Sequence, residues 1–233
     1  MLSIIVMLLC SVAWCHSQEN VFDLTKMKSG HYAFAVRLTN QLEATALLES
    51  GIPAMLVDSA FIFKNLDKAG LELILDLNHN LLKVGARKDF TRRKDYLKVA
   101  LNTDAYLNMP AIRTKLMVDI GRESTALDGN YVIDFGAPSF LFLHGHNANI
   151  TQWIQENKIE LQQARNREGK VVAQAFMPRA CRVESLDFKN PPIVVTTALP
   201  RFTSEGNLGL KFFQDVVAVF DFGKGYCYLK TTE

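Results

Sequence analysis

Two short segments in different halves of the chain share one pattern, and this repeat constrains the fold more than any other sequence feature. Residues 47–58 read LLESGIPAMLVD, and residues 132–143 read VIDFGAPSFLFL. In each segment an apolar pair precedes a carboxylate, and glycine, proline and a further apolar run follow at equal offsets. We interpret both as strand–turn–strand units that begin their turns with Glu49 and Asp134. Two unrelated units of this kind would not explain a carboxylate at the head of each turn.

Most of the remaining chain also predicts strands. Short helices are expected at residues 59–70 and after Thr151, which is a suitable N-cap residue. A Gly-Lys-Gly turn at residues 223–225 predicts a tight hairpin near the C-terminus. The sequence therefore predicts an all-β, barrel-like fold with a few short helices. The further predicted strands are alternating or β-branched apolar runs at residues 31–38, 71–77, 112–120, 171–176, 193–197 and 216–222.

The first residues predict export. Residues 2–15 are uncharged and mostly apolar, and this run is shorter than the ~20 residues of a membrane span. A signal peptide over residues 1–17 is expected, with a retained anchor as the alternative. The protein would then be secreted or periplasmic and free of the membrane. Its net charge of +2 gives no strong field, so nucleic acid is not an expected partner.

Two cysteines, Cys181 and Cys227, remain after the predicted signal peptide. An oxidising compartment would allow them to form one disulfide, and two separate buried thiols are the alternative. A second motif, His144-Gly145-His146, would need a distant carboxylate to complete a metal site. Because metal sites usually have three or more protein ligands, a polar loop is the preferred interpretation and no metal is predicted.

The repeated turns resemble the active-site turns of the retropepsin-like aspartic peptidases, especially the exported bacterial type with two repeats. In that family an Asp-Thr/Ser-Gly-Ala turn follows an apolar strand in each half, and an apolar-apolar-Gly element packs behind the turn. Residues 134–137 (DFGA) and 49–51 (ESG) stand at the turn positions, and residues 206–213 (GNLGLKFF) resemble the element behind the second turn. The resemblance covers roughly residues 110–231, and the first half looks shortened.

The resemblance implies a two-lobed pepsin- or retropepsin-like barrel. Its N-terminal lobe would be shortened and occupy residues 18–109, and its C-terminal lobe would occupy residues 110–233. Asp134 and Glu49 would be the catalytic pair, acting without a cofactor on a peptide or protein in an extended conformation. The residues that would support the two turns are Ser50, Gly51, Phe135, Gly136 and Ala137.

Both turns depart from the family pattern in ways that bear on catalysis. In the family, two carboxylates ~3 Å apart share one proton and act on a water as base and acid. Glu49 is one methylene longer than Asp, and a misplacement of ~1 Å can cost ~100-fold in rate. Phe135 lacks the hydroxyl that braces the turns, and a buried hydrogen bond contributes ~1 kcal/mol.

Three hypotheses follow from these departures. The first is an aspartic endopeptidase that uses Asp134 and Glu49 of one chain. The second is a catalytically inactive relative that binds extended peptides by strand addition. The third is a homodimer in which two copies of Asp134 meet across an isologous interface, whereas the first two allow a monomer.

Overall fold

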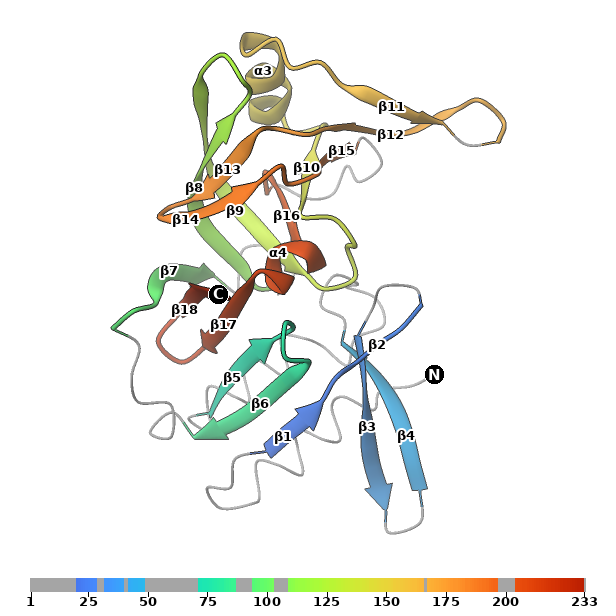
Figure 1. Cartoon of the computed structure of the whole chain (residues 1–233), viewed down its shortest axis with the longest axis vertical. Coiled ribbons are helices and arrows are strands. Elements are labelled where there is room, and N and C mark those ends of the chain that lie inside the picture. The colour runs from blue at the N-terminus through green and yellow to red at the C-terminus, as the bar shows by residue number, and fades with distance from the viewer. Residues whose placement is uncertain are drawn as a thin grey trace.

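The computed structural model describes residues 20–28, 32–39, 42–48, 71–86, 94–102, 109–165, 167–196 and 204–232. Strands dominate these residues and two short helices accompany them, so the prediction of a mainly β fold with a few short helices is confirmed (Figure 1). The predicted helix at residues 59–70 lies outside the described part of the chain, as does the first repeat turn.

The bounds of the elements follow. The first strands are β1 (Asn20–Asp23), β2 (Thr25–Lys26), β3 (Tyr32–Thr39), β4 (Leu42–Leu48), β5 (Leu71–Asp76), β6 (Leu81–Ala86), β7 (Leu97–Asn102), β8 (Ala111–Asp119) and β9 (Ser124–Asp134). The later strands are β10 (Leu141–His144), β11 (Gln162–Arg165), β12 (Val171–Phe176), β13 (Ala180–Val183), β14 (Leu186–Lys189), β15 (Ile193–Thr196), β16 (Gly206–Gly209), β17 (Val216–Asp221) and β18 (Tyr226–Thr231). The helices are α3 (Ala148–Glu156) and α4 (Leu210–Gln214).

One large sheet joins strands from both predicted lobes. Its strand order is β1-β6-β5-β17-β18-β7-β8-β9-β16-β10-β15-β12-β11, and the β13–β14 hairpin pairs with β8. The C-terminal hairpin lies inside this order, because β17 pairs with β5 and β18 pairs with β7 (Figure 1). The pairing of β7 with β8 carries the sheet across the predicted lobe boundary between residues 109 and 110. Strands β2, β3 and β4 form a separate three-stranded sheet.

The predicted strands are confirmed where the structure describes them, but one predicted cap is wrong. Helix α3 begins after Asn147, whose side chain accepts a hydrogen bond from the Asn149 N–H. Thr151 lies inside the helix, and its hydroxyl donates to the carbonyl oxygen of Gly145. Asn is a better N-cap residue than Thr, and the helix begins one turn earlier than predicted.

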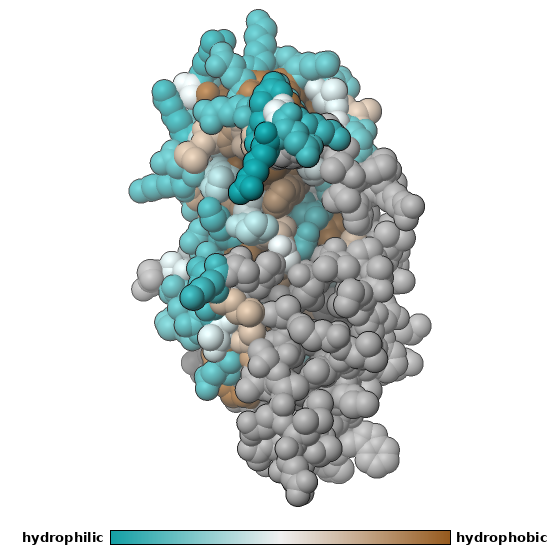
Figure 2. Space-filling view, turned by 90° about the vertical axis from the view of Figure 1, so that its right-hand side faces the viewer, coloured by the Kyte–Doolittle hydropathy of each residue, from teal (hydrophilic) through white to brown (hydrophobic). Residues whose placement is uncertain are grey.

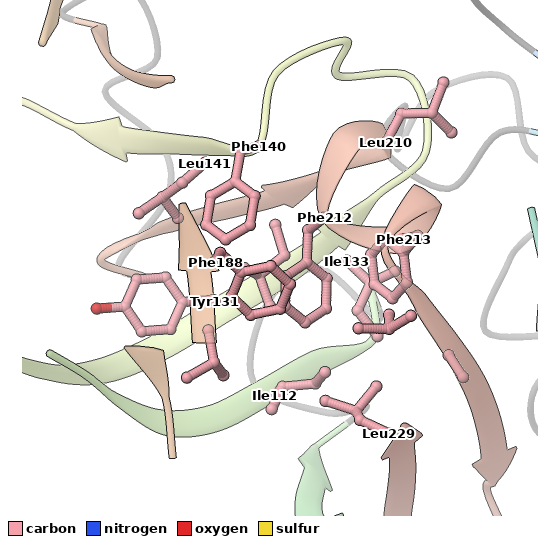
Figure 3. Close-up of a cluster of buried hydrophobic side chains, with 14 of the residues drawn as sticks. Ile112, Tyr131, Ile133, Phe140, Leu141, Phe188, Leu210, Phe212, Phe213 and Leu229 are labelled. Carbon is pink, nitrogen blue, oxygen red and sulfur yellow. The ribbon is translucent and has the colours of Figure 1, made fainter. Parts of the chain in front are cut away.

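An aromatic cluster fills the core behind β9, β10 and β16 (Figure 3). The ring of Phe140 lies 4.9 Å from that of Phe188 and 5.6 Å from that of Phe212, centroid to centroid. Phe213 meets Phe212 edge to face at 5.0 Å. Such aromatic pairs contribute about 0.5–1.5 kcal/mol beyond the burial of their area. The described surface in Figure 2 is largely hydrophilic in its upper part, which agrees with apolar side chains gathered inside.

Strand β16 runs between the two strands that flank the second repeat turn. It pairs in parallel with β9 and antiparallel with β10, so it separates the two arms of the turn. Two glycines make this close approach feasible. A Cβ on Gly206 would lie 2.0 Å from the carbonyl oxygen of Phe142, and a Cβ on Gly209 would lie 2.2 Å from that of Ser139. The resemblance implied an element packed behind this turn, and β16 occupies that position.

We predict that Gly209→Ala lowers the free energy of unfolding by about 3 kcal/mol, because backbone has to move to admit the new methyl group. Urea unfolding measures this loss. The matched control is Gly169→Ala, where the added Cβ meets nothing within 4 Å and only the positive φ of 77° opposes the change. The control is expected to cost about 1 kcal/mol. Equal losses for the two variants would contradict the proposed tight packing of β16.

Candidate active site

Asp134 ends β9 at the head of the second repeat turn, and its carboxylate is held on both oxygens. Oδ1 accepts hydrogen bonds from the backbone N–H groups of Gly136, at 3.0 Å, and Ala137, at 3.1 Å. Oδ2 accepts a hydrogen bond of 2.8 Å from the side-chain amide of Asn207 on β16. The Asp134 side chain is half-buried. Three donors from two segments therefore fix the orientation of this carboxyl group.

The strand behind the turn fixes the turn itself. The Gly209 N–H donates to the carbonyl oxygen of Phe140 at 3.0 Å, and the Leu210 N–H donates to that of Ala137 at 2.7 Å. These bonds connect the start of α4 to both sides of the turn. Backbone groups at the end of β16 and the start of α4 therefore fix the turn that carries Asp134.

Phe135 occupies the position at which the family carries a hydroxyl, and its ring points into the core. The side chain is buried, with its ring centroid 4.9 Å from that of Phe213 and 6.4 Å from that of Phe220, both edge to face. An aromatic anchor thus stands where the resemblance implied a polar brace. Phe135 holds its own turn onto the C-terminal strand β17 and helix α4.

Polar residues gather on the face of the sheet that carries Asp134. The β9–β16 and β16–β10 registers put Val132, Asn207 and Phe142 side by side on this face. His144, two residues after Phe142, lies on the same face and is fully buried. Its Nδ1 lies 3.0 Å from the carbonyl oxygen of Ser204. Among the described residues, His144, Ser204, Glu205 and Asn207 are all buried polar groups, although the opposite face is apolar.

Asn207 is a site residue that the sequence analysis did not identify. It lies in residues 206–209 (GNLG), where the family element has an apolar residue in place of asparagine. The sequence signal that could have identified Asn207 is a polar side chain in an otherwise apolar segment bounded by two glycines. Its partner Asp134 is 73 positions earlier in the chain, so only the strand register brings the two together.

The predicted site residues of the first half are not described by the structure. Glu49, Ser50 and Gly51 lie outside the described residues, so their pairing with Asp134 remains a prediction. In the second half, the N–H groups of Gly136 and Ala137 donate to the Asp134 carboxylate, and their role as supports of a catalytic turn stays a prediction.

Cys181 and Cys227 are two separate buried thiols, so the structure contains the second of the two alternatives and no disulfide between them. Cys181 lies on β13 and pairs with Val118 and Phe188, whereas Cys227 lies on β18 and pairs with Phe220 and Val99. Burial raises the pKa of Cys181 to about 12 and raises that of Cys227 as well. Such thiols stay protonated and unreactive at neutral pH, and they take no part in the site.

The described residues contain no group of three or more His, Cys, Asp or Glu side chains arranged to hold a metal ion. His144 and His146 instead stack on each other, with ring centroids 5.5 Å apart. In the same part of the chain, neither helix has the length and apolar character to cross a membrane.

Comparison with known proteins finds similar structures but no family assignment. No protein-family model matches the chain, and no curated protein does. A retropepsin-like aspartic protease from Rickettsia conorii is 17% identical, with a TM-score of 0.39, over 57% of this chain and 89% of the other. An aspartic proteinase from Irpex lacteus is 9% identical, with a TM-score of 0.46, over 93% of this chain and 82% of the other.

Basic 7S globulin from soybean is also similar, at 12% identity and a TM-score of 0.47, over 86% of this chain and 67% of the other. The similar structures thus include aspartic-protease folds of the retropepsin-like and pepsin-like kinds. At these identities and TM-scores the similarities do not assign a function, and the chemistry has to be inferred from the residues around Asp134.

We predict that Phe135→Thr, which introduces a hydroxyl at this turn position, lowers the free energy of unfolding by about 3 kcal/mol. The cavity left beside Phe213 and Phe220 destabilises the fold by more than one new hydrogen bond of the hydroxyl stabilises it. Thermal or urea unfolding measures the change, and Phe222→Thr is the control. Phe222 is only partly buried, although it also stacks on Phe220, at 5.8 Å. A Phe135→Thr variant as stable as the parent would show that the ring is not an anchor.

Proposed function

We propose that the chain is an aspartic peptidase homologue in which Asp134 and Glu49 activate a water molecule to hydrolyse a peptide bond. The observation that supports this proposal best is the arrangement around Asp134. A carboxylate at the head of a strand–turn–strand unit is oriented by Gly136, Ala137 and Asn207, and β16 is packed between the arms of that unit. Pre-orientation of a reacting group is what a catalytic carboxylate requires.

The reaction needs only the two carboxyl groups and water. The ionised carboxylate takes a proton from the water as its oxygen forms a bond to the peptide carbonyl carbon. The protonated carboxyl gives its proton to the carbonyl oxygen, which yields a tetrahedral intermediate. The carboxyl group that took the water proton then gives it to the peptide nitrogen, the C–N bond breaks, and the other carboxylate takes back a proton from a hydroxyl of the intermediate as the carbonyl re-forms. Neither a metal nor a cofactor enters this sequence, and the substrate is a peptide or protein in an extended conformation.

The second candidate is an inactive homologue that binds extended peptides, and two observations favour it. Asn207 donates to Oδ2 of Asp134, so an amide already engages the oxygen that a catalytic water would contact. Phe135 packs into the core and offers no hydroxyl to the first turn. A peptide would then bind by strand addition, with backbone hydrogen bonds supplying affinity.

We propose that the protein is secreted or periplasmic and is released from a signal peptide. Its motifs resemble those of the exported bacterial type with two repeats. One chain would supply both carboxylates and act as a monomer. A homodimer that pairs two copies of Asp134 is the alternative assembly, and it would leave Glu49 without a catalytic role.

We predict that the intact protein cleaves members of a peptide library at acidic pH and that Asp134→Asn lowers cleavage about 100-fold or more. Glu49→Gln is expected to have a similar effect, because the acid and the base are both required. Mass spectrometry of the digested library measures the products. Asp187→Asn, on the exposed side of β14, is the control and is expected to retain full activity.

The outcomes distinguish the candidates. Cleavage that depends on Asp134 and not on Glu49 would contradict the single-chain pair and favour the homodimer. The absence of cleavage at every pH, with peptide binding retained in a pull-down of the same library, would contradict the peptidase and favour the peptide-binding homologue. Cleavage that survives Asp134→Asn would contradict all three hypotheses.

A further inference from the structure

The amide of Asn207 stands between two titratable side chains on one face of the sheet. Its Nδ2 donates to Asp134 on one side. On the other side lies His144, which is the diagonal neighbour of Asn207 because Phe142 stands directly opposite Asn207 in the β10–β16 ladder. Diagonal neighbours in antiparallel strands lie within reach of long side chains. Asn207 is 7% exposed and its Oδ1 forms no hydrogen bond of normal geometry.

The tautomer of His144 follows from its other contact. Nδ1 faces the carbonyl oxygen of Ser204 at 3.0 Å, and a carbonyl oxygen can only accept, so Nδ1 carries a proton. The Ser204 hydroxyl, 3.2 Å from the same nitrogen, is compatible with this assignment. In the neutral imidazole Nε2 is therefore an acceptor. Nε2 becomes a donor only when His144 is protonated.

These contacts make the amide responsive to the charge of His144. An imidazolium can donate from Nε2 to Asn207 Oδ1, which keeps the amide N–H group on Asp134. A neutral imidazole presents an acceptor to Oδ1, which is unfavourable unless the amide turns its N–H group toward His144. That rotation would put Oδ1 against Asp134, an arrangement that suits only a protonated carboxyl group.

We propose that Asn207 is a positioning residue that couples Asp134 to His144, and that protonation of His144 holds the amide N–H group of Asn207 on the Asp134 carboxylate. This coupling rests on the proposed function for one point, which is that Asp134 is the catalytic carboxylate. In either functional candidate, the imidazole would decide whether the second oxygen of Asp134 is covered by the amide.

The surroundings of His144 determine where this change occurs. Burial is the largest influence and lowers the pKa of the imidazole from its ordinary 6.5, and His146 lowers it further. The Ser204 carbonyl oxygen, the Asn207 side chain and Glu205 act in the opposite direction. Among the described residues, His146 and Glu205 are thus the titratable groups that act on His144. The net effect lowers the pKa of His144, so the imidazolium that holds the amide on Asp134 forms only at acidic pH.

The experiment is an NMR titration of the full chain without substrate, from acidic to neutral pH. We expect the Asp134 carboxyl carbon and the Asn207 side-chain amide to shift with the same midpoint as the His144 ring carbons. In Asn207→Leu, which restores the apolar residue of the family element, His144 still titrates but the Asp134 signal no longer follows it. His146→Gln is the matched control, and all three signals should still move together in it.

Two results would overturn the coupling. In the parent protein, Asp134 and Asn207 signals that show no change at the His144 midpoint would mean that the amide does not respond. In Asn207→Leu, the Asp134 signal could still follow His144, which would mean that the two charges interact through space. The signals are read without substrate, so a chain that cleaves nothing can still display the coupling, and an active chain can lack it.

Discussion

The passage of β16 between the arms of the Asp134 turn is the contact on which the rest of the structure depends. It brings backbone against backbone at Gly206 and Gly209, where no side chain would fit. The same passage starts α4, whose Phe212 and Phe213 enter the aromatic core. It also carries Asn207 to the Asp134 carboxylate. One four-residue strand therefore links the fold, the core and the candidate site.

Phe135 in the turn and Asn207 on the strand behind it have different physical consequences for Asp134. Phe135 exchanges a polar brace for burial against Phe213 and Phe220, so the turn is held from the core side. Asn207 adds a donor to the carboxylate where the family element is apolar. Together they leave Asp134 well oriented but covered on one oxygen, which is why an active peptidase and a peptide-binding homologue both remain compatible with this site. In the proposed coupling, a protonated His144 holds this amide on the carboxylate, and loss of that proton removes the constraint.

The sequence predicted the parts of the fold that depend on local pattern. The repeat located Asp134 at the end of a strand, and the alternation of residues 112–120 predicted β8. Asn207 escaped notice, and His144 was noted only as part of a histidine motif, because the meeting of these residues with Asp134 depends on the register of strands distant in the chain. Local pattern was also silent on the direction of the Phe135 ring and on the state of Cys181 and Cys227. Those features are decided by which strands pair, and a motif does not encode that.

The central claim is that the Asp134 carboxylate faces a second acidic turn from the same chain. A crystal structure of the full chain at acidic pH tests it most directly, through the separation of the Asp134 and Glu49 carboxyl groups. The account predicts oxygens of the two groups within about 4 Å of each other in one chain, close enough to share a proton. Glu49 on a different face of the molecule, or Asp134 facing its own copy across a dimer, would contradict it.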